Sequence, residues 1–150
     1  MYQFSERIPF ASWSPKLVPA VAAGVYAIWE KDILIYCGMS GRGLVPDSSP
    51  NKKKLGLVTR LHSHASGRLS GDQFCVYVAN RLVIPSIRPE QLEKFASGEL
   101  SLDHLTKIYI HERLDFQFTV TRDGLEAYAL EAACRAGRIF NVKPILNPST

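Results

Sequence analysis

The chain of 150 residues lacks any apolar run that approaches the roughly 20 residues a helix needs to cross a bilayer. Its opening stretch, MYQFSERIPF, has an acid and a proline where a secretory signal would have basic and then apolar residues. No internal repeat, low-complexity segment or linker divides the chain. We therefore expect one cytoplasmic domain over residues 1–150, with no membrane partner.

Cysteine is scarce as well. The three cysteines, Cys37, Cys75 and Cys134, lie far apart, each inside an apolar run. A disulfide framework or a zinc site would place cysteines in pairs at short spacing. We therefore expect three buried free thiols.

What the chain does have is enough apolar content for a folded core, with 46% hydrophobic and 21% charged residues. Lys and Arg number 18 against 14 Asp and Glu, a balance that permits a polyanionic partner without requiring one. The basic residues Lys52, Lys53 and Lys54 lie in a stretch from 41 to 56 that is rich in Gly, Pro and Ser. This stretch is predicted to be a long loop whose basic tip either binds nucleic acid or is simply solvated.

Four segments are predicted to be strands because they are rich in β-branched and aromatic residues: 24–29, 33–37, 74–84 and 116–121. Only Glu30-Lys31-Asp32 separates the first two, which suits a β-hairpin. Pro85 should end the third strand.

Helices are predicted from about residue 55 to 67, over 89–98, over 102–113, and from an Asp123 cap to about residue 135, where Gly137 ends the last one. Residues 142–148 should be extended because proline disfavours helix in the residue before it. The expected fold is α/β, more closely α+β: a small, mainly antiparallel central sheet flanked by helices.

The predicted hairpin brings two tyrosines together. With three residues in the turn, Tyr26 and Tyr36 lie directly opposite one another on one face of the sheet. Such a pair is either a plain core contact or part of a reactive site. A bulge or a register slip would break the pairing.

Two helices carry polar residues at informative positions. Arg60 and His64 are four residues apart and lie beside the apolar face of their helix, where helix meets sheet, unless they are an ordinary exposed pair. Glu131 lies in the middle of a segment that is apolar almost all round, which predicts burial. A buried carboxylate needs a cation, so Glu131 either pairs with an arginine or binds a metal.

Five short motifs follow one another in the order of a known family. They are Gly24-Val25-Tyr26, Tyr36-Cys37-Gly38, Arg60-x-x-x-His64, a lone acid at Glu131, and Lys143-Pro144-x-x-Asn147. In this order and spacing, residues 24–147 resemble the GIY-YIG nuclease superfamily. Cys37 stands where the family usually has an aliphatic residue, a difference that concerns packing more than chemistry.

The resemblance implies an endonuclease that hydrolyses DNA phosphodiester bonds with one divalent metal, Mg²⁺ or Mn²⁺. By family analogy, Tyr26 takes the proton from the attacking water, and Tyr36 positions the water and the phosphate. Arg60 holds the scissile phosphate and His64 hydrogen-bonds a tyrosine or relays the proton. Glu131 is the one protein ligand of the metal, and Asn147 orients groups without reacting.

The resemblance also implies that residues 116–121 are the third strand of the family's sheet. Residues 74–113 are then an insertion of strand and helix. In restriction enzymes of the family, such an insertion can carry DNA contacts or a dimer interface. Double-stranded DNA is the expected partner, and a homodimer is compatible with it. Two alternatives stay open. A DNA-binding module with this fold that does not cut should have lost Tyr26, Arg60 or Glu131, and none is lost. A subunit of a repair complex should bring an appended domain.

Overall fold

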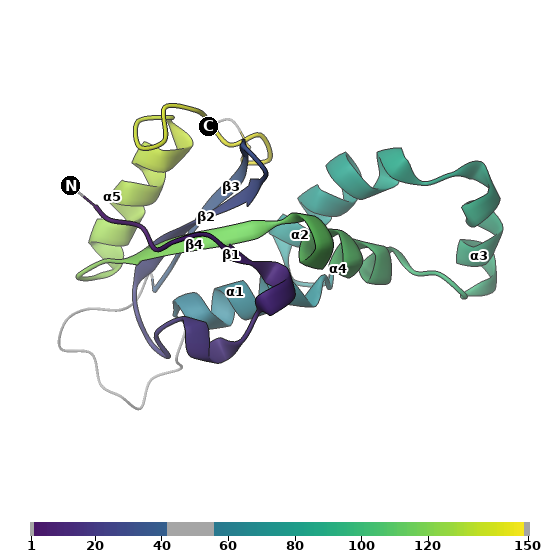
Figure 1. Cartoon of the computed structure of the whole chain (residues 1–150), viewed down its shortest axis with the longest axis horizontal. Coiled ribbons are helices and arrows are strands. Elements are labelled where there is room, and N and C mark those ends of the chain that lie inside the picture. Colours follow the sequence, from purple (N-terminus) through teal and green to yellow (C-terminus); the bar gives the residue numbers. More distant parts are fainter. Residues whose placement is uncertain (1, 42–55, 149–150) are drawn as a thin grey trace.

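The computed structural model describes residues 2–41 and 56–148 (Figure 1). A four-stranded antiparallel sheet has the order β1-β4-β2-β3. Its strands are β1 (Ile8–Pro9), β2 (Gly24–Glu30), β3 (Ile33–Ser40) and β4 (Asp115–Val120). Helices pack on both faces, which confirms the predicted α+β class. Within these residues, no helix is long and apolar enough to span a membrane.

The sheet divides the core into two parts because side chains alternate along β2. Val25 and Ala27 pack with α5 (Gly124–Arg135), whereas Tyr26 and Ile28 pack with the helices on the opposite face. The three cysteines are buried free thiols, as predicted.

The β2–β3 hairpin forms, but the predicted pairing of Tyr26 with Tyr36 is wrong. The turn has two residues rather than three, and a bulge interrupts the pairing between Ile28 and Trp29. Each difference shifts the register by one residue, so Tyr26 lies opposite Gly38 and Tyr36 lies opposite Ile28. A total shift of two residues keeps both tyrosines on one face of the sheet. They are diagonal neighbours, with ring centroids 6.4 Å apart.

Helix α1 (Leu57–Ser66) confirms the predicted first helix. Leu57, Leu61 and Ala65 are buried on one side, and Gly67 ends the helix in the left-handed conformation at φ 71°. The last helix is also confirmed: the Asp123 side chain accepts a hydrogen bond from the backbone N–H of Glu126 at the start of α5.

The predicted strand over residues 74–84 is wrong. This segment forms α2 (Gln73–Val78), the π-helical turn η3 (Ala79–Val83) and the 3-10 turn η4 (Ile84–Ser86). Its buried residues Phe74, Cys75, Val78 and Ala79 recur at helical spacing. The Asp72 carboxylate caps α2 by accepting from the N–H of Cys75 at 3.0 Å, and this cap selects helix over strand.

The rest of the segment agrees with the prediction of two short helices. They are α3 (Leu92–Ser97), preceded by the 3-10 turn η5 (Pro89–Gln91), and α4 (Leu102–Arg113). Figure 1 shows α3 at the tip of an arm that extends away from the sheet.

The predicted burial of α5 on all sides is also wrong. Leu125 is 80% exposed and Tyr128 56% exposed, so α5 buries one side against the sheet and presents the other to solvent. After α5, the C-terminal segment (residues 142–148) was predicted to be extended, but it forms bends and irregular backbone rather than a strand. It lies beside β3, where Ile145 and Leu146 donate backbone hydrogen bonds to the carbonyls of Leu34 and Ile35.

Candidate active site

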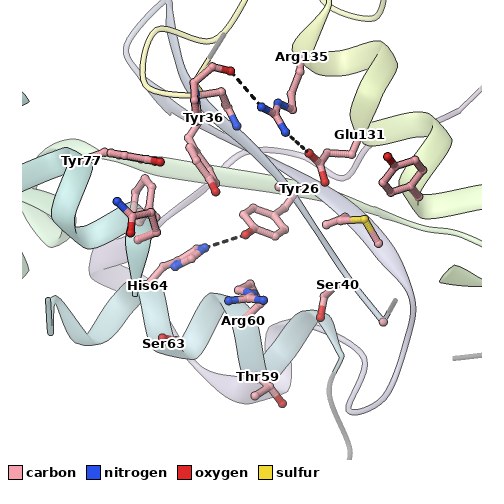
Figure 2. Close-up of a pocket in the computed structure, with 18 residues that line it drawn as sticks. Tyr26, Tyr36, Ser40, Thr59, Arg60, Ser63, His64, Tyr77, Glu131 and Arg135 are labelled. Atoms are coloured by element: carbon pink, nitrogen blue, oxygen red, sulfur yellow. Dashed lines mark hydrogen bonds and ion pairs between the residues drawn. The ribbon is translucent and has the colours of Figure 1, made fainter. Parts of the chain in front are cut away.

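A cleft of about 740 Å³ lies along β3, which is an edge strand of the sheet. We call it the β3 cleft (Figure 2). Its walls come from β2 and β3, from α1 and α2, and from α5 with the C-terminal segment. All the residues predicted to be catalytic line it: Tyr26, Tyr36, Arg60, His64, Glu131 and Asn147.

Tyr26 and His64 form a buried hydrogen bond at the base of this cleft. The Tyr26 hydroxyl lies 2.7 Å from Nε2 of His64, and the two side chains come from β2 and α1. On its other side the imidazole faces Asp72, with Nδ1 2.7 Å from Oδ2. His64 is 2% exposed and Tyr26 1%, so this contact is shielded from solvent. The predicted contact between His64 and a tyrosine is therefore present.

Burial dominates the acid–base properties of the tyrosines. Loss of hydration raises the pKa of Tyr26 well above 10, and the nearby Arg60 only partly offsets it. The same cause, with the Glu131 charge adding to it, raises the pKa of Tyr36 to about 12. Both phenols are therefore neutral at neutral pH, and either one needs a proton acceptor before it can act as a base.

His64 is suited to that role because it is neutral. Burial lowers its pKa below the ordinary value, although the Asp72 carboxylate opposes this shift. Burial alone would raise the pKa of Asp72, but hydrogen bonds from His64, Ser63 and the Cys75 N–H outweigh it and bring the pKa to about 2. A neutral imidazole thus lies between a phenol and a charged carboxylate.

Tyr36 and Arg60 occupy the more open part of the cleft. The Tyr36 ring packs against Phe74 and His64, with centroids 5.1 and 6.1 Å apart, which fixes its orientation. Arg60 lies one helical turn before His64 on α1 and is exposed. Its charge opposes the rise in the pKa of Tyr26 and of Tyr36, and it lines the same cleft as both phenols. The prediction that both residues emerge where helix meets sheet is therefore confirmed for Arg60 alone, because His64 is buried with the apolar side of α1.

Glu131 faces the same cleft from α5, across from the tyrosines (Figure 2). Its Oε1 accepts from Nη1 of Arg135 at 3.1 Å, and its side chain is 16% exposed. Arg135 also donates to the carbonyl of Pro148 at 3.0 Å. The charge of Glu131 is therefore partly compensated by an arginine on its own helix, one of the two predicted partners.

The donor set bears on the metal that the resemblance implies. Across residues 2–41 and 56–148, no three His, Cys, Asp or Glu side chains converge on a point that could hold a metal ion. Mg²⁺ often takes only one or two carboxylates and completes its shell with water and phosphate oxygens. Glu131 fits an ion of this kind, bound through one carboxylate, provided that the contact with Arg135 loosens.

Asn147 anchors the C-terminal segment to β3. Its Oδ1 accepts from the N–H of Cys37 at 2.8 Å, and its Nδ2 donates to the Cys37 carbonyl at 2.9 Å. This two-point contact fixes the strand that carries Tyr36. Asn147 thus ties the C-terminal segment to β3, and its role in orienting reacting groups stays a prediction.

Sequence reasoning missed several residues of the site. Asp72 and Arg135 had readable signals, because Asp72 is a capping residue before a helix and Arg135 follows Glu131 by four residues. Ser63, next to His64 on α1, had none. The predicted nucleic-acid contacts Lys52, Lys53 and Lys54 lie outside the described residues.

No protein-family model, curated protein or solved structure matches the chain.

Proposed function

We propose that the chain is a metal-dependent endonuclease of the GIY-YIG type that hydrolyses DNA phosphodiester bonds in the β3 cleft. The observation that supports this most is that Tyr26, Arg60 and Glu131 line one cleft although they come from three separate elements. A core tyrosine, an exposed helix arginine and a surface ion pair would have no reason to converge in this way.

The proposed first step is proton transfer through Tyr26. Its phenol is neutral, so its oxygen can take a proton from the attacking water only as its own proton moves to Nε2 of His64, 2.7 Å away. The neutral imidazole accepts that proton, and Tyr36 orients the water and the phosphate. Tyr26 can therefore act as the base only together with His64.

Arg60 and Glu131 act on the phosphate side of the reaction. The Arg60 guanidinium binds the scissile phosphate and favours the additional charge of the transition state. Glu131 holds the metal, and Mg²⁺ supplies electrophilic stabilisation of the phosphate and the leaving oxygen when it is bound. Arg135, released from Glu131, is then available to a neighbouring phosphate.

A second cavity adjoins the β3 cleft and gives a DNA strand room to continue beyond it. It has a volume of about 450 Å³ and shares Glu131, Arg135 and Asn147 with the β3 cleft before it reaches Lys143. Cations therefore line both cavities: Arg60 the β3 cleft, Lys143 the second cavity, and Arg135 both. We propose double-stranded DNA as the substrate in the cytoplasm, with Lys52, Lys53 and Lys54 as further contacts; a homodimer stays a prediction of the resemblance.

The test separates binding from cleavage through Glu131→Ala. Because Glu131 contacts Arg135 and the metal but not the DNA in this proposal, the variant should bind duplex DNA in EDTA at least as tightly as the wild type, yet fail to cut it in Mg²⁺. Its stability should fall by about 1 kcal/mol or less, the cost of one i,i+4 ion pair. Gel-shift titration, cleavage and thermal melting measure the three effects.

Glu126→Ala is the matched control. Glu126 lies on the same helix, but it bonds Tyr2 and Arg122 away from the cleft, so cleavage should be unchanged. Cleavage by Glu131→Ala at the wild-type rate would assign Glu131 to a structural ion pair. Tight binding without cleavage by the wild-type chain would favour the DNA-binding module instead.

A further inference from the structure

Asp72 lies directly behind the histidine of the β3 cleft and belongs to no predicted motif. It precedes α2, is 3% exposed, and uses both carboxylate oxygens. Oδ2 accepts from Ser63 Oγ at 2.6 Å and faces His64 Nδ1 at 2.7 Å. Oδ1 accepts from the N–H of Cys75 at 3.0 Å. The carboxylate thus connects α1 to α2.

We propose that Asp72 is a positioning residue for cleavage, which holds His64 with its proton on Nδ1 so that Nε2 accepts the proton of Tyr26. This inference rests on the proposed function, because it concerns the same proton transfer. It gives the inserted segment a role in the site, since Asp72 is oriented by the first turn of α2.

The direction of the hydrogen bonds follows from the chemistry of each partner. An ionised carboxylate can only accept, so His64 Nδ1 must be the donor to Asp72. In a neutral imidazole the other nitrogen then carries the lone pair, so Tyr26 must be the donor to Nε2. The chain of contacts therefore permits one direction of proton movement, from Tyr26 towards His64.

Asp72 also acts when the proton has moved. The imidazolium so formed is buried, and a charge in that position is costly without an opposite charge in contact. The Asp72 carboxylate supplies that charge at 2.7 Å, against the repulsion of Arg60. Among the described residues, the titratable or charged groups that surround His64 are Tyr26, Tyr36, Arg60, Asp72 and Cys75.

Asp72→Asn separates this role from the structural cap. The amide oxygen can still accept from the Cys75 N–H, so α2 keeps its cap. The amide nitrogen then faces His64 and donates to Nδ1, which moves the imidazole proton to Nε2 and leaves no acceptor for Tyr26. The matched control is Asp123→Asn, which changes the cap of α5 in the same way without a histidine behind it.

The experiment compares cleavage kinetics and the tautomer of His64. In Mg²⁺, Asp72→Asn should lower kcat by about 10²- to 10⁴-fold, the contribution of a positioned base, with KM within about twofold of wild type. Asp123→Asn should leave kcat within about twofold. Nitrogen-15 NMR of the metal-free chain, assigned through His64→Gln, should show the Nδ1–H tautomer in wild type and the Nε2–H tautomer in Asp72→Asn.

Two results would overturn the inference: an Nε2–H tautomer in the wild-type chain, or a kcat of Asp72→Asn close to the wild-type value. If Asp72→Asn fails to fold, the tautomer of wild type decides. If the wild-type chain cuts no DNA, the proposed function fails, and the two tautomers alone decide whether Asp72 sets the state of His64.

Discussion

Gly38→Ala is the substitution whose effect follows most directly from the structure. Gly38 pairs with Tyr26 across the hairpin, and the tyrosine ring lies over its Cα. A Cβ at this position would lie 2.2 Å from Oη of Tyr26 and 2.4 Å from Cζ. Ordinary contact begins at 3.4 Å, so the tip of the ring has to move by at least about 1 Å.

The ring has little room for that movement. Tyr26 is 1% exposed, and its ring centroid lies 5.4 Å from that of His64 and 6.4 Å from that of Tyr36. Overpacking of this kind costs about 1–3 kcal/mol. The displacement would also break the hydrogen bond from Tyr26 to His64. If the proposed mechanism holds, a misplacement of about 1 Å lowers cleavage by about 100-fold.

The clash itself is measured by urea unfolding of the wild type, Gly38→Ala, Tyr26→Leu and the double variant. Tyr26→Leu removes Oη, Cζ and Cε2, the three atoms nearest the added Cβ. Gly38→Ala should therefore cost about 1–3 kcal/mol in the wild-type background and close to nothing in Tyr26→Leu. Equal costs in the two backgrounds, or a stabilised single variant, would refute the argument.

Two further predictions concern charge. Replacing Lys52, Lys53 and Lys54 together by Ala should make the dependence of duplex affinity on salt shallower, by about 0.9 in log–log slope for each phosphate that is no longer neutralised; an unchanged slope would mean a solvated loop. Acid should lower the free energy of unfolding from about pH 6.5 downwards, because burial lowers the pKa of His64 and the unfolded chain then binds more protons. In urea titrations between about pH 7.5 and 5.5, His64→Gln should lose this part of the pH dependence; equal slopes would contradict it.

The parts of the fold that sequence predicts are those with strong local signals. The hairpin strands are rich in β-branched and aromatic residues and flank a short turn. Helices α1, α4 and α5 each have a residue that favours a helix end, Gly67, Ser101 or Asp123. Residues 74–84 have aromatic and β-branched side chains that suit either state, and the Asp72 cap and the spacing of the buried residues distinguish helix from strand. The helical period is present in this segment, but its composition favours a strand.

The register and the burial of α5 depend on information that is not local. A bulge after Ile28 and a two-residue turn each move the pairing, and neither has a clear signature in the apolar pattern. Alanines around Glu131 suit a buried or an exposed helix equally, so composition overestimated its burial. For the site, motif order brought together residues that do line one cleft, whereas Asp72 needed the fold of α2 to be found.

The central claim is that the β3 cleft cuts DNA with a metal held by Glu131, and the most direct measurement is cleavage itself. Supercoiled duplex and single-stranded circular DNA are incubated with the wild-type chain and with Glu131→Gln, in Mg²⁺, Mn²⁺ or EDTA. The proposal predicts nicked or linear duplex only with the wild-type chain and a divalent ion. No cleavage under any of these conditions, or equal cleavage in EDTA or by Glu131→Gln, would contradict it.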